Sequence, residues 1–173
     1  MTKEKRGLYT GSFDPLTLGH LNIIERASLL FDHLEVLVAT NTTKKYLFTA
    51  AERVDLIKAA CAHLPNVKVD LLQTGLVADY VLDHHITAVV RGVRNYTDFE
   101  YELAISRANR MQNDQFETII MTADPLYSHL SSSIIKEIAF FDGSIDDMVP
   151  ENVEVAIKKR ISENKMKKVE INQ

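Results

Sequence analysis

A loop near the N-terminus carries the clearest chemical pattern in this 173-residue chain, with the sequence TGSFDPLTLGH over residues 10–20. Gly11 allows the backbone to approach a ligand closely, and Ser12 adds a small hydroxyl donor. Thr17 is placed to cap a following helix, so His20 falls in its first turn, where free N–H groups and the helix dipole favour phosphate. The pattern predicts a phosphate site, although spacing alone also fits a turn that only shapes the chain.

Cationic residues recur in two later segments. Lys44 and Lys45 lie in a polar loop, and Arg91 and Arg94 follow an almost wholly apolar run over residues 86–90. An arginine directly after a buried strand is costly unless it is paired, and its planar fork suits two phosphate oxygens at once. These positions favour an anion site, whereas a loop lysine by itself is more often simply solvated.

The elements that must position these residues alternate along the chain. Hydrophobic spacing predicts strands at residues 8–9, 34–39, 67–71, 86–90 and 117–121, and helices at 21–31, 49–64, 77–84, 96–112, 132–140 and 150–162. Five strands separated by helices predict βαβ units with right-handed crossovers. The expected fold is therefore α/β: a single-domain, Rossmann-like, doubly wound five-stranded parallel sheet with helices on both faces.

Such sheets bind ligands at the carboxyl ends of their strands, where the loops described above are expected to meet. We expect one domain over residues 1–163. Residues 164–173 are polar and rich in lysine, and they are expected to form a frayed C-terminal tail.

Composition narrows the class of protein. The formal net charge is −4, which argues against a nucleic-acid partner and an anionic membrane surface. One cysteine, Cys61, excludes an intramolecular disulfide. The chain has neither an apolar run of about 18 residues nor the apolar core of a signal peptide, so a cytoplasmic location is expected.

The motif over residues 11–20 resembles the T/HxGH signature of the nucleotidyltransferase superfamily, in its phosphopantetheine adenylyltransferase branch. Further blocks resemble the same family in the same order: KK at 44–45, RGVR at 91–94, DFEYE at 98–102, SSS at 131–133 and PENV at 150–153. These blocks are distributed along the chain from about residue 7 to residue 160.

The resemblance implies transfer of the adenylyl group of ATP to 4′-phosphopantetheine, giving 3′-dephospho-CoA and pyrophosphate. The acceptor phosphate is already a nucleophile, so the protein need only align two anions and stabilise the charge between them. By resemblance, His20 stabilises the transition state, Lys44 bridges the phosphates of both substrates, and Arg91 binds the phosphopantetheine phosphate.

The resemblance also implies two sets of binding residues. Those expected to bind ATP are Ser12, Phe13, His20, Gly92, Val93, Arg94, Glu102, Tyr127, Ser128, His129, Leu130, Ser131, Ser132 and Ser133. Those expected to bind phosphopantetheine are Ser12, Lys44, Val77 and Arg91, although core packing explains an apolar Val77 equally well. No protein-made metal site is expected, and Mg²⁺ would arrive with ATP. The family further implies a homohexamer and CoA as a feedback ligand.

Two other classes remain open. Within the superfamily, the chain could be a nicotinate-mononucleotide or cytidylyl transferase, although the RGVR and DFEYE blocks and the short length favour phosphopantetheine. Alternatively, it could be a non-catalytic nucleotide-sensing module, although such a sensor has no need of His20, Lys44 and Arg91 together.

Overall fold

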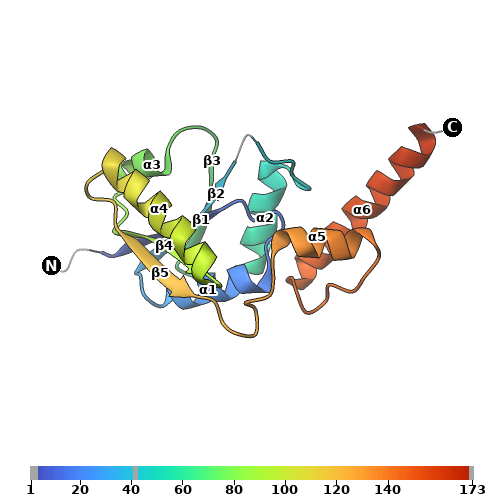
Figure 1. The fold of residues 1–173 in the computed structure, drawn as a ribbon, viewed down its shortest axis with the longest axis horizontal. Coiled ribbons are helices and arrows are strands. Elements are labelled where there is room, and N and C mark those ends of the chain that lie inside the picture. Colours follow the sequence, from blue (N-terminus) through green and yellow to red (C-terminus); the bar gives the residue numbers. More distant parts are fainter. Residues whose placement is uncertain (1–3, 41–42, 172–173) are drawn as a thin grey trace.

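A single parallel sheet forms the centre of the fold (Figure 1), seen in a computed structural model that describes residues 4–40 and 43–171. Its strand order is β3-β2-β1-β4-β5. The strands are β1 (Arg6–Gly11), β2 (His33–Ala39), β3 (Val67–Leu72), β4 (Ala88–Val93) and β5 (Thr118–Thr122). This arrangement confirms the predicted doubly wound α/β fold.

Helices cover both faces of the sheet. Their bounds are α1 (Leu18–Ser28), α2 (Ala50–Ala60), α3 (Val77–Asp83), α4 (Tyr96–Gln112), α5 (Ser132–Phe140) and α6 (Glu151–Ile171). Strand residues alternate between faces, so Tyr9 packs in the core with α1 and α2, whereas Leu8 packs in a second core with α3. Residues of α5 and α6 extend the first core, which places these two helices beside the α1 and α2 face.

The N-cap predicted at Thr17 is confirmed, and a second N-cap lies at Thr49. Thr17 accepts a hydrogen bond from the backbone N–H of His20 at the start of α1, and Thr49 accepts one from Glu52 at the start of α2. In both caps the side chain at the third helical position also bonds back to the cap backbone, which completes a capping box.

Several boundaries differ from those predicted. Strand β1 begins at Arg6 and β4 runs on to Val93, because their polar or glycine ends give no apolar signal although their backbones still pair with neighbours. Helix α2 ends at Ala60, before a series of turns.

The largest difference is in the C-terminal segment, which was predicted to fray. Helix α6 continues to Ile171 and extends away from the sheet (Figure 1). Lysine, glutamate and methionine are strong helix formers, so a polar composition here supports a helix and not a coil. Residues 172–173 of the predicted tail, and residues 1–3 and 41–42 of the predicted domain, lie outside the described residues. Within the described residues, no helix is long and apolar enough to cross a membrane.

Candidate active site

Two adjoining cavities open at the carboxyl ends of the central strands β1 and β4. Their volumes are about 360 Å³ and 330 Å³. Residues from β1, the loop before α2, β4 and α4 line both cavities and form a shared wall, namely Thr10, Gly11, Lys44, Arg91, Tyr101 and Glu102. Two ligands could therefore lie side by side and meet at Lys44 and Arg91.

The structure brings most of the predicted site residues together here. Besides the shared wall, the first cavity is lined by the predicted residues Phe13, His20, Gly92, Arg94, Tyr127, Leu130, Ser131 and Ser132. The second is lined by the predicted residues Ser12 and Val77. Four predicted ATP contacts, Val93, Ser128, His129 and Ser133, line neither cavity.

The loop between β1 and α1 is held in an unusual shape. Phe13 has φ of +48°, a left-handed conformation that costs a non-glycine residue free energy. The buried carboxylate of Asp14 accepts hydrogen bonds from the backbone N–H groups of Leu47 (2.8 Å) and Phe48 (2.9 Å), and Lys136 of α5 lies 3.2 Å from it. Asp14 therefore fixes this loop to the segment that follows Lys44.

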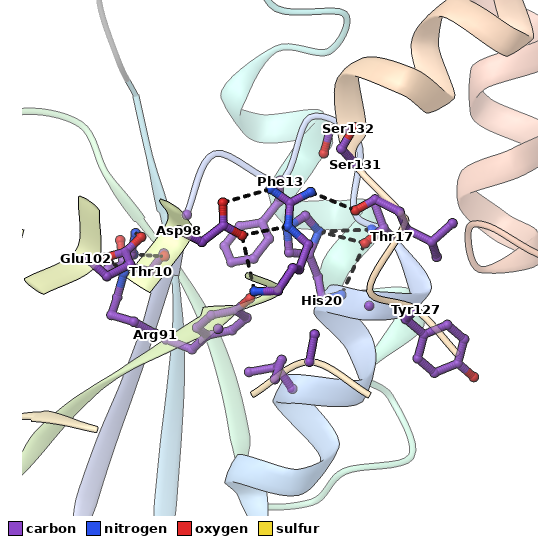
Figure 2. A pocket seen from close by; sticks show the side chains of 18 of the residues that line it. Thr10, Phe13, Thr17, His20, Arg91, Asp98, Glu102, Tyr127, Ser131 and Ser132 are labelled. Carbon is purple, nitrogen blue, oxygen red and sulfur yellow. Dashed lines mark hydrogen bonds and ion pairs between the residues drawn. The ribbon is translucent and has the colours of Figure 1, made fainter. Parts of the chain in front are cut away.

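The capping box of α1 also orients the imidazole of His20 (Figure 2). The backbone N–H of Thr17 donates to Nδ1 of His20 over 3.1 Å, and the Thr17 hydroxyl lies 3.2 Å from the same nitrogen. Because Nδ1 accepts a hydrogen bond, the proton of a neutral ring lies on Nε2. His20 lines the first cavity and is held in the tautomer that can donate from Nε2.

The electrostatic surroundings favour that neutral ring. Burial, together with the nearby guanidinium groups of Arg94 and Arg91, lowers the pKa of His20 from 6.5 to about 4. Removal from water and neighbouring positive charge both oppose the imidazolium. In the protein without ligand, His20 is therefore a neutral hydrogen-bond donor at pH 7.

Arg91 lies in the shared wall with its guanidinium already positioned. Its Nε and Nη2 each donate to one oxygen of Glu102 over 2.6 Å, and Nη1 donates to the carbonyl of Thr10 over 2.5 Å (Figure 2). This bidentate pair leaves further N–H groups of Arg91 for a ligand. The carboxylate of Glu102, which was expected to bind ATP, is engaged with Arg91; its role toward ATP remains a prediction.

Arg94 connects two walls of the first cavity. Its Nε donates to Asp98 of α4 over 2.8 Å, and its Nη1 donates to the carbonyl of Leu130 over 3.0 Å. Asp98 was not predicted to belong to the site, although its position four residues after Arg94 is the spacing of a helical ion pair. The ion pair joins the end of β4 to α4, and the bond to Leu130 joins it to the loop that precedes α5.

The three serines at the start of α5 have different surroundings. Ser131 caps the helix by accepting a hydrogen bond from Ile134, and Ser132 donates to the carbonyl of Pro15 over 2.9 Å. Ser133 is exposed. The helix N-terminus faces the first cavity through Ser131 and Ser132, which is the environment that suits a phosphate chain.

A buried arginine behind the site was missed by the sequence reasoning. Arg53 of α2 is 1% exposed, and its Nη1 donates to the carbonyl of Ser12 over 2.6 Å. Its sequence signal is modest: it stands four residues before the buried Ile57, so the two share the inward face of the helix.

Comparison with known proteins shows the family to which this chain belongs. The cytidylyltransferase-like family model matches residues 8–138. A phosphopantetheine adenylyltransferase of Limosilactobacillus fermentum is 48% identical over 165 residues, which cover 95% of this chain and 95% of that protein. A phosphopantetheine adenylyltransferase of Finegoldia magna is 44% identical and covers 90% of this chain and 96% of its own. The chain belongs to the phosphopantetheine adenylyltransferase family.

Membership of the phosphopantetheine adenylyltransferase family agrees with the solved structures as far as the fold is concerned. A structure from Vibrio parahaemolyticus, described as a nicotinate-nucleotide adenylyltransferase, has a TM-score of 0.68 to this chain, and the match covers 92% of this chain and 95% of that chain. Only 16% of the aligned residues are identical, so this likeness concerns the fold alone.

Proposed function

We propose that this chain transfers the adenylyl group of ATP to 4′-phosphopantetheine, giving 3′-dephospho-CoA and pyrophosphate in coenzyme A biosynthesis. The observation that supports this most directly is the pair of cavities that share Lys44 and Arg91. A transfer between two phosphate-bearing molecules needs two adjoining sites with cations where they meet.

ATP is assigned to the first cavity, which includes His20, Arg94 and the N-terminus of α5. Phosphopantetheine is assigned to the second, with its arm toward Val77 and its phosphate at the shared wall. The acceptor phosphate then attacks the α-phosphorus of ATP in line as pyrophosphate leaves, with no covalent enzyme intermediate.

In this scheme the chain's own residues position the phosphates of both substrates and stabilise the negative charge of the transition state. Nε2–H of His20 donates to the α-phosphate as negative charge accumulates on it, and Lys44 neutralises phosphate oxygens of both substrates. Arg91 remains oriented by Glu102 while its outer N–H groups bind the acceptor phosphate. The N-terminus of α5 receives the β- and γ-phosphates.

Mg²⁺ belongs to the proposal as a companion of ATP. The described residues contain no group of three or more His, Cys, Asp or Glu side chains arranged to hold a metal ion. The carboxylates in the wall of the first cavity, Asp98 and Glu102, are each paired with an arginine. Mg²⁺ would therefore be held mainly by phosphate oxygens and water, where it would neutralise the charge of the triphosphate.

The proposal extends to assembly, location and regulation by resemblance to the family: a cytoplasmic homohexamer with CoA as a feedback ligand. One feature of the chain supports assembly. Among the residues of α4, only Glu102 is buried, and one side of the helix exposes large apolar side chains, namely Tyr96, Phe99, Leu103 and Met111. An apolar helix face of this kind gains stability when a second copy covers it. Sedimentation equilibrium tests this part, and a monomer at micromolar concentration contradicts it.

A panel of acceptors tests the substrate assignment. Release of pyrophosphate is measured with ATP and each of 4′-phosphopantetheine, nicotinate mononucleotide and a phosphorylated alcohol, and again with CTP in place of ATP. We expect release only with ATP and 4′-phosphopantetheine. Release with nicotinate mononucleotide, or with CTP, would move the chain to another branch of the superfamily, and binding without release would indicate a sensor.

A further inference from the structure

Arg53 is a buried cation that stability alone does not explain. It is 1% exposed, and no described carboxylate forms an ion pair with it. Its Nε has no hydrogen-bond partner among the described residues, and its guanidinium stacks 4.2 Å from the centre of the Tyr46 ring. A desolvated charge without a carboxylate is expensive, and a cation in the first turns of a helix also opposes the helix dipole.

What Arg53 holds is the loop that carries the phosphate-binding pattern. Its Nη1 donates to the carbonyl of Ser12 over 2.6 Å. Tyr46, on which it stacks, lies two residues after Lys44. Arg53 lines neither cavity. It contacts two segments from behind, and their residues Gly11 and Lys44 line the shared wall.

The orientation of one peptide follows from this contact. In a trans peptide the carbonyl and the N–H point in opposite directions, so the N–H of Phe13 points away from Arg53 when the Ser12 carbonyl points toward it. Among the described residues, this N–H has no hydrogen-bond partner. Phe13 also has the strained φ of +48° and lines the first cavity. A strained residue persists only where its surroundings fix it, and Arg53 supplies such a contact.

We propose that Arg53 is a positioning residue: it holds and polarises the Ser12–Phe13 peptide so that the N–H of Phe13 is presented to a phosphate of the bound nucleotide. A guanidinium bonded to the carbonyl draws electron density from the peptide and strengthens its N–H as a donor. The role toward ATP rests on the proposed function, whereas the orientation of the peptide does not.

Arg53→Met and Arg53→Gln test this role by separating activity from stability. Arg53→Met removes the charge and the donor but keeps the volume, and we expect kcat/KM to fall by about 100-fold, as for other small misplacements of catalytic groups. Because an unpaired buried charge is replaced by an apolar chain, Tm should fall by about 4 °C or less. Arg53→Gln retains an amide donor and should recover part of the activity. Arg53→Gln also provides the test of activity if the Arg53→Met variant does not fold.

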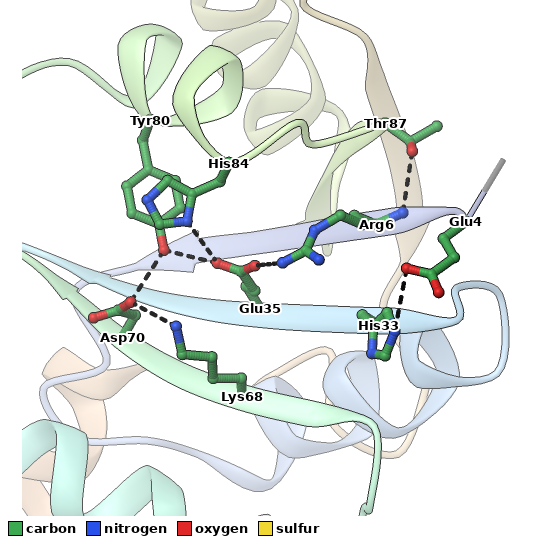
Figure 3. A network of polar contacts seen from close by, with 9 residues as sticks. All are labelled: Glu4, Arg6, His33, Glu35, Lys68, Asp70, Tyr80, His84 and Thr87. Carbon is green, nitrogen blue, oxygen red and sulfur yellow. Dashed lines mark hydrogen bonds and ion pairs between the residues drawn. The ribbon is translucent and has the colours of Figure 1, made fainter.

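Arg6→Met is the matched control, because Arg6 is an arginine of β1 whose loss affects stability away from the site. Its Nη2 donates to the buried carboxylate of Glu35 over 2.6 Å, in a network with Tyr80 and His84 (Figure 3). Removing Arg6 leaves the buried negative charge of Glu35 without its arginine partner, so Tm should fall further than in Arg53→Met. The value of kcat/KM should stay within twofold of wild type. If Arg53→Met and Arg53→Gln also keep kcat/KM within twofold of wild type, the positioning role is wrong.

The amide of Phe13 gives a readout that does not depend on turnover. The chain has seven phenylalanines, so ¹⁵N-phenylalanine labelling gives a simple spectrum. Inorganic pyrophosphate should shift the Phe13 resonance in wild type and in Arg6→Met but not in Arg53→Met. An equal response in Arg53→Met overturns the inference. If wild type lacks adenylyl transfer but this contrast is seen, the proposed function fails and the positioning role stands.

Discussion

Arg91 and Glu102 form a bidentate ion pair in which both hydrogen bonds are 2.6 Å long, in the wall that the two cavities share. The carbonyl of Thr10 takes a third donor of the same guanidinium. Arg91 is therefore fixed before any ligand binds, and little conformational entropy remains to be lost when a phosphate does.

Arg91→Lys should raise the KM for 4′-phosphopantetheine more than the KM for ATP. A lysine keeps the charge but cannot reach two oxygens of Glu102 and the Thr10 carbonyl with a planar fork, so its ammonium is poorly fixed. We expect about a tenfold increase for phosphopantetheine, measured by steady-state kinetics with each substrate varied in turn. If the KM for ATP rises more, the two cavities have been assigned in the wrong order.

His20→Ala should lower kcat by about 100-fold or more while changing substrate affinity little, because its contact strengthens as charge develops in the transition state. Calorimetric titration with ATP and steady-state kinetics measure the two quantities separately. A near-normal kcat would remove His20 from the mechanism, and a loss confined to ATP affinity would make it a ground-state contact only.

Thr17→Val should reduce both stability and kcat. The valine removes the hydroxyl that caps α1 and lies 3.2 Å from Nδ1 of His20, so we expect a loss of about 1 kcal/mol in unfolding free energy and a loosely held imidazole. Thr49→Val is a matched control, since Thr49 caps α2 in the same way but lines neither cavity. Urea unfolding and kinetics should show a stability loss in both variants and a kcat loss in Thr17→Val alone; equal kcat values would contradict the role given to Thr17.

The protonation of His20 gives a prediction about pH. The folded chain holds the pKa of His20 at about 4, whereas an unfolded chain titrates near 6.5. Between these values the unfolded chain binds a proton that the folded chain does not, so stability from this residue is complete above pH 6.5 and is lost as pH falls toward 4.

Two measurements check this. An NMR titration of the ligand-free protein should place the His20 midpoint well below 6, and ATP should raise it because nearby negative charge favours imidazolium. The unfolding free energy of wild type should also fall relative to His20→Gln between pH 7 and pH 4, by about 3 kcal/mol at most. A midpoint near 6.5 without ligand would contradict the neutral donor.

Local patterns predicted the sheet, the six helices and the N-cap at Thr17, because these depend on hydrophobic spacing and on residues a few positions apart. The predicted end of α6 was wrong, because a polar, lysine-rich segment has no hydrophobic spacing although its residues favour a helix. Family resemblance supplied the site residues, and the structure gathers most of them around the two cavities. It could not supply the contact between Arg53 and Ser12, because these residues are 41 positions apart and nothing in either segment indicates the pairing. The same holds for Asp14, whose loop contacts depend on the tertiary fold.

The most direct test of adenylyl transfer is the stoichiometry of products in a single reaction. ATP and 4′-phosphopantetheine are mixed with the protein and Mg²⁺, and 3′-dephospho-CoA and pyrophosphate are quantified together by mass spectrometry and ³¹P NMR. If the two cavities bind ATP and 4′-phosphopantetheine side by side, both products form in a one-to-one ratio, with no AMP. Pyrophosphate accompanied by AMP, or ATP bound with no 3′-dephospho-CoA formed, would contradict it.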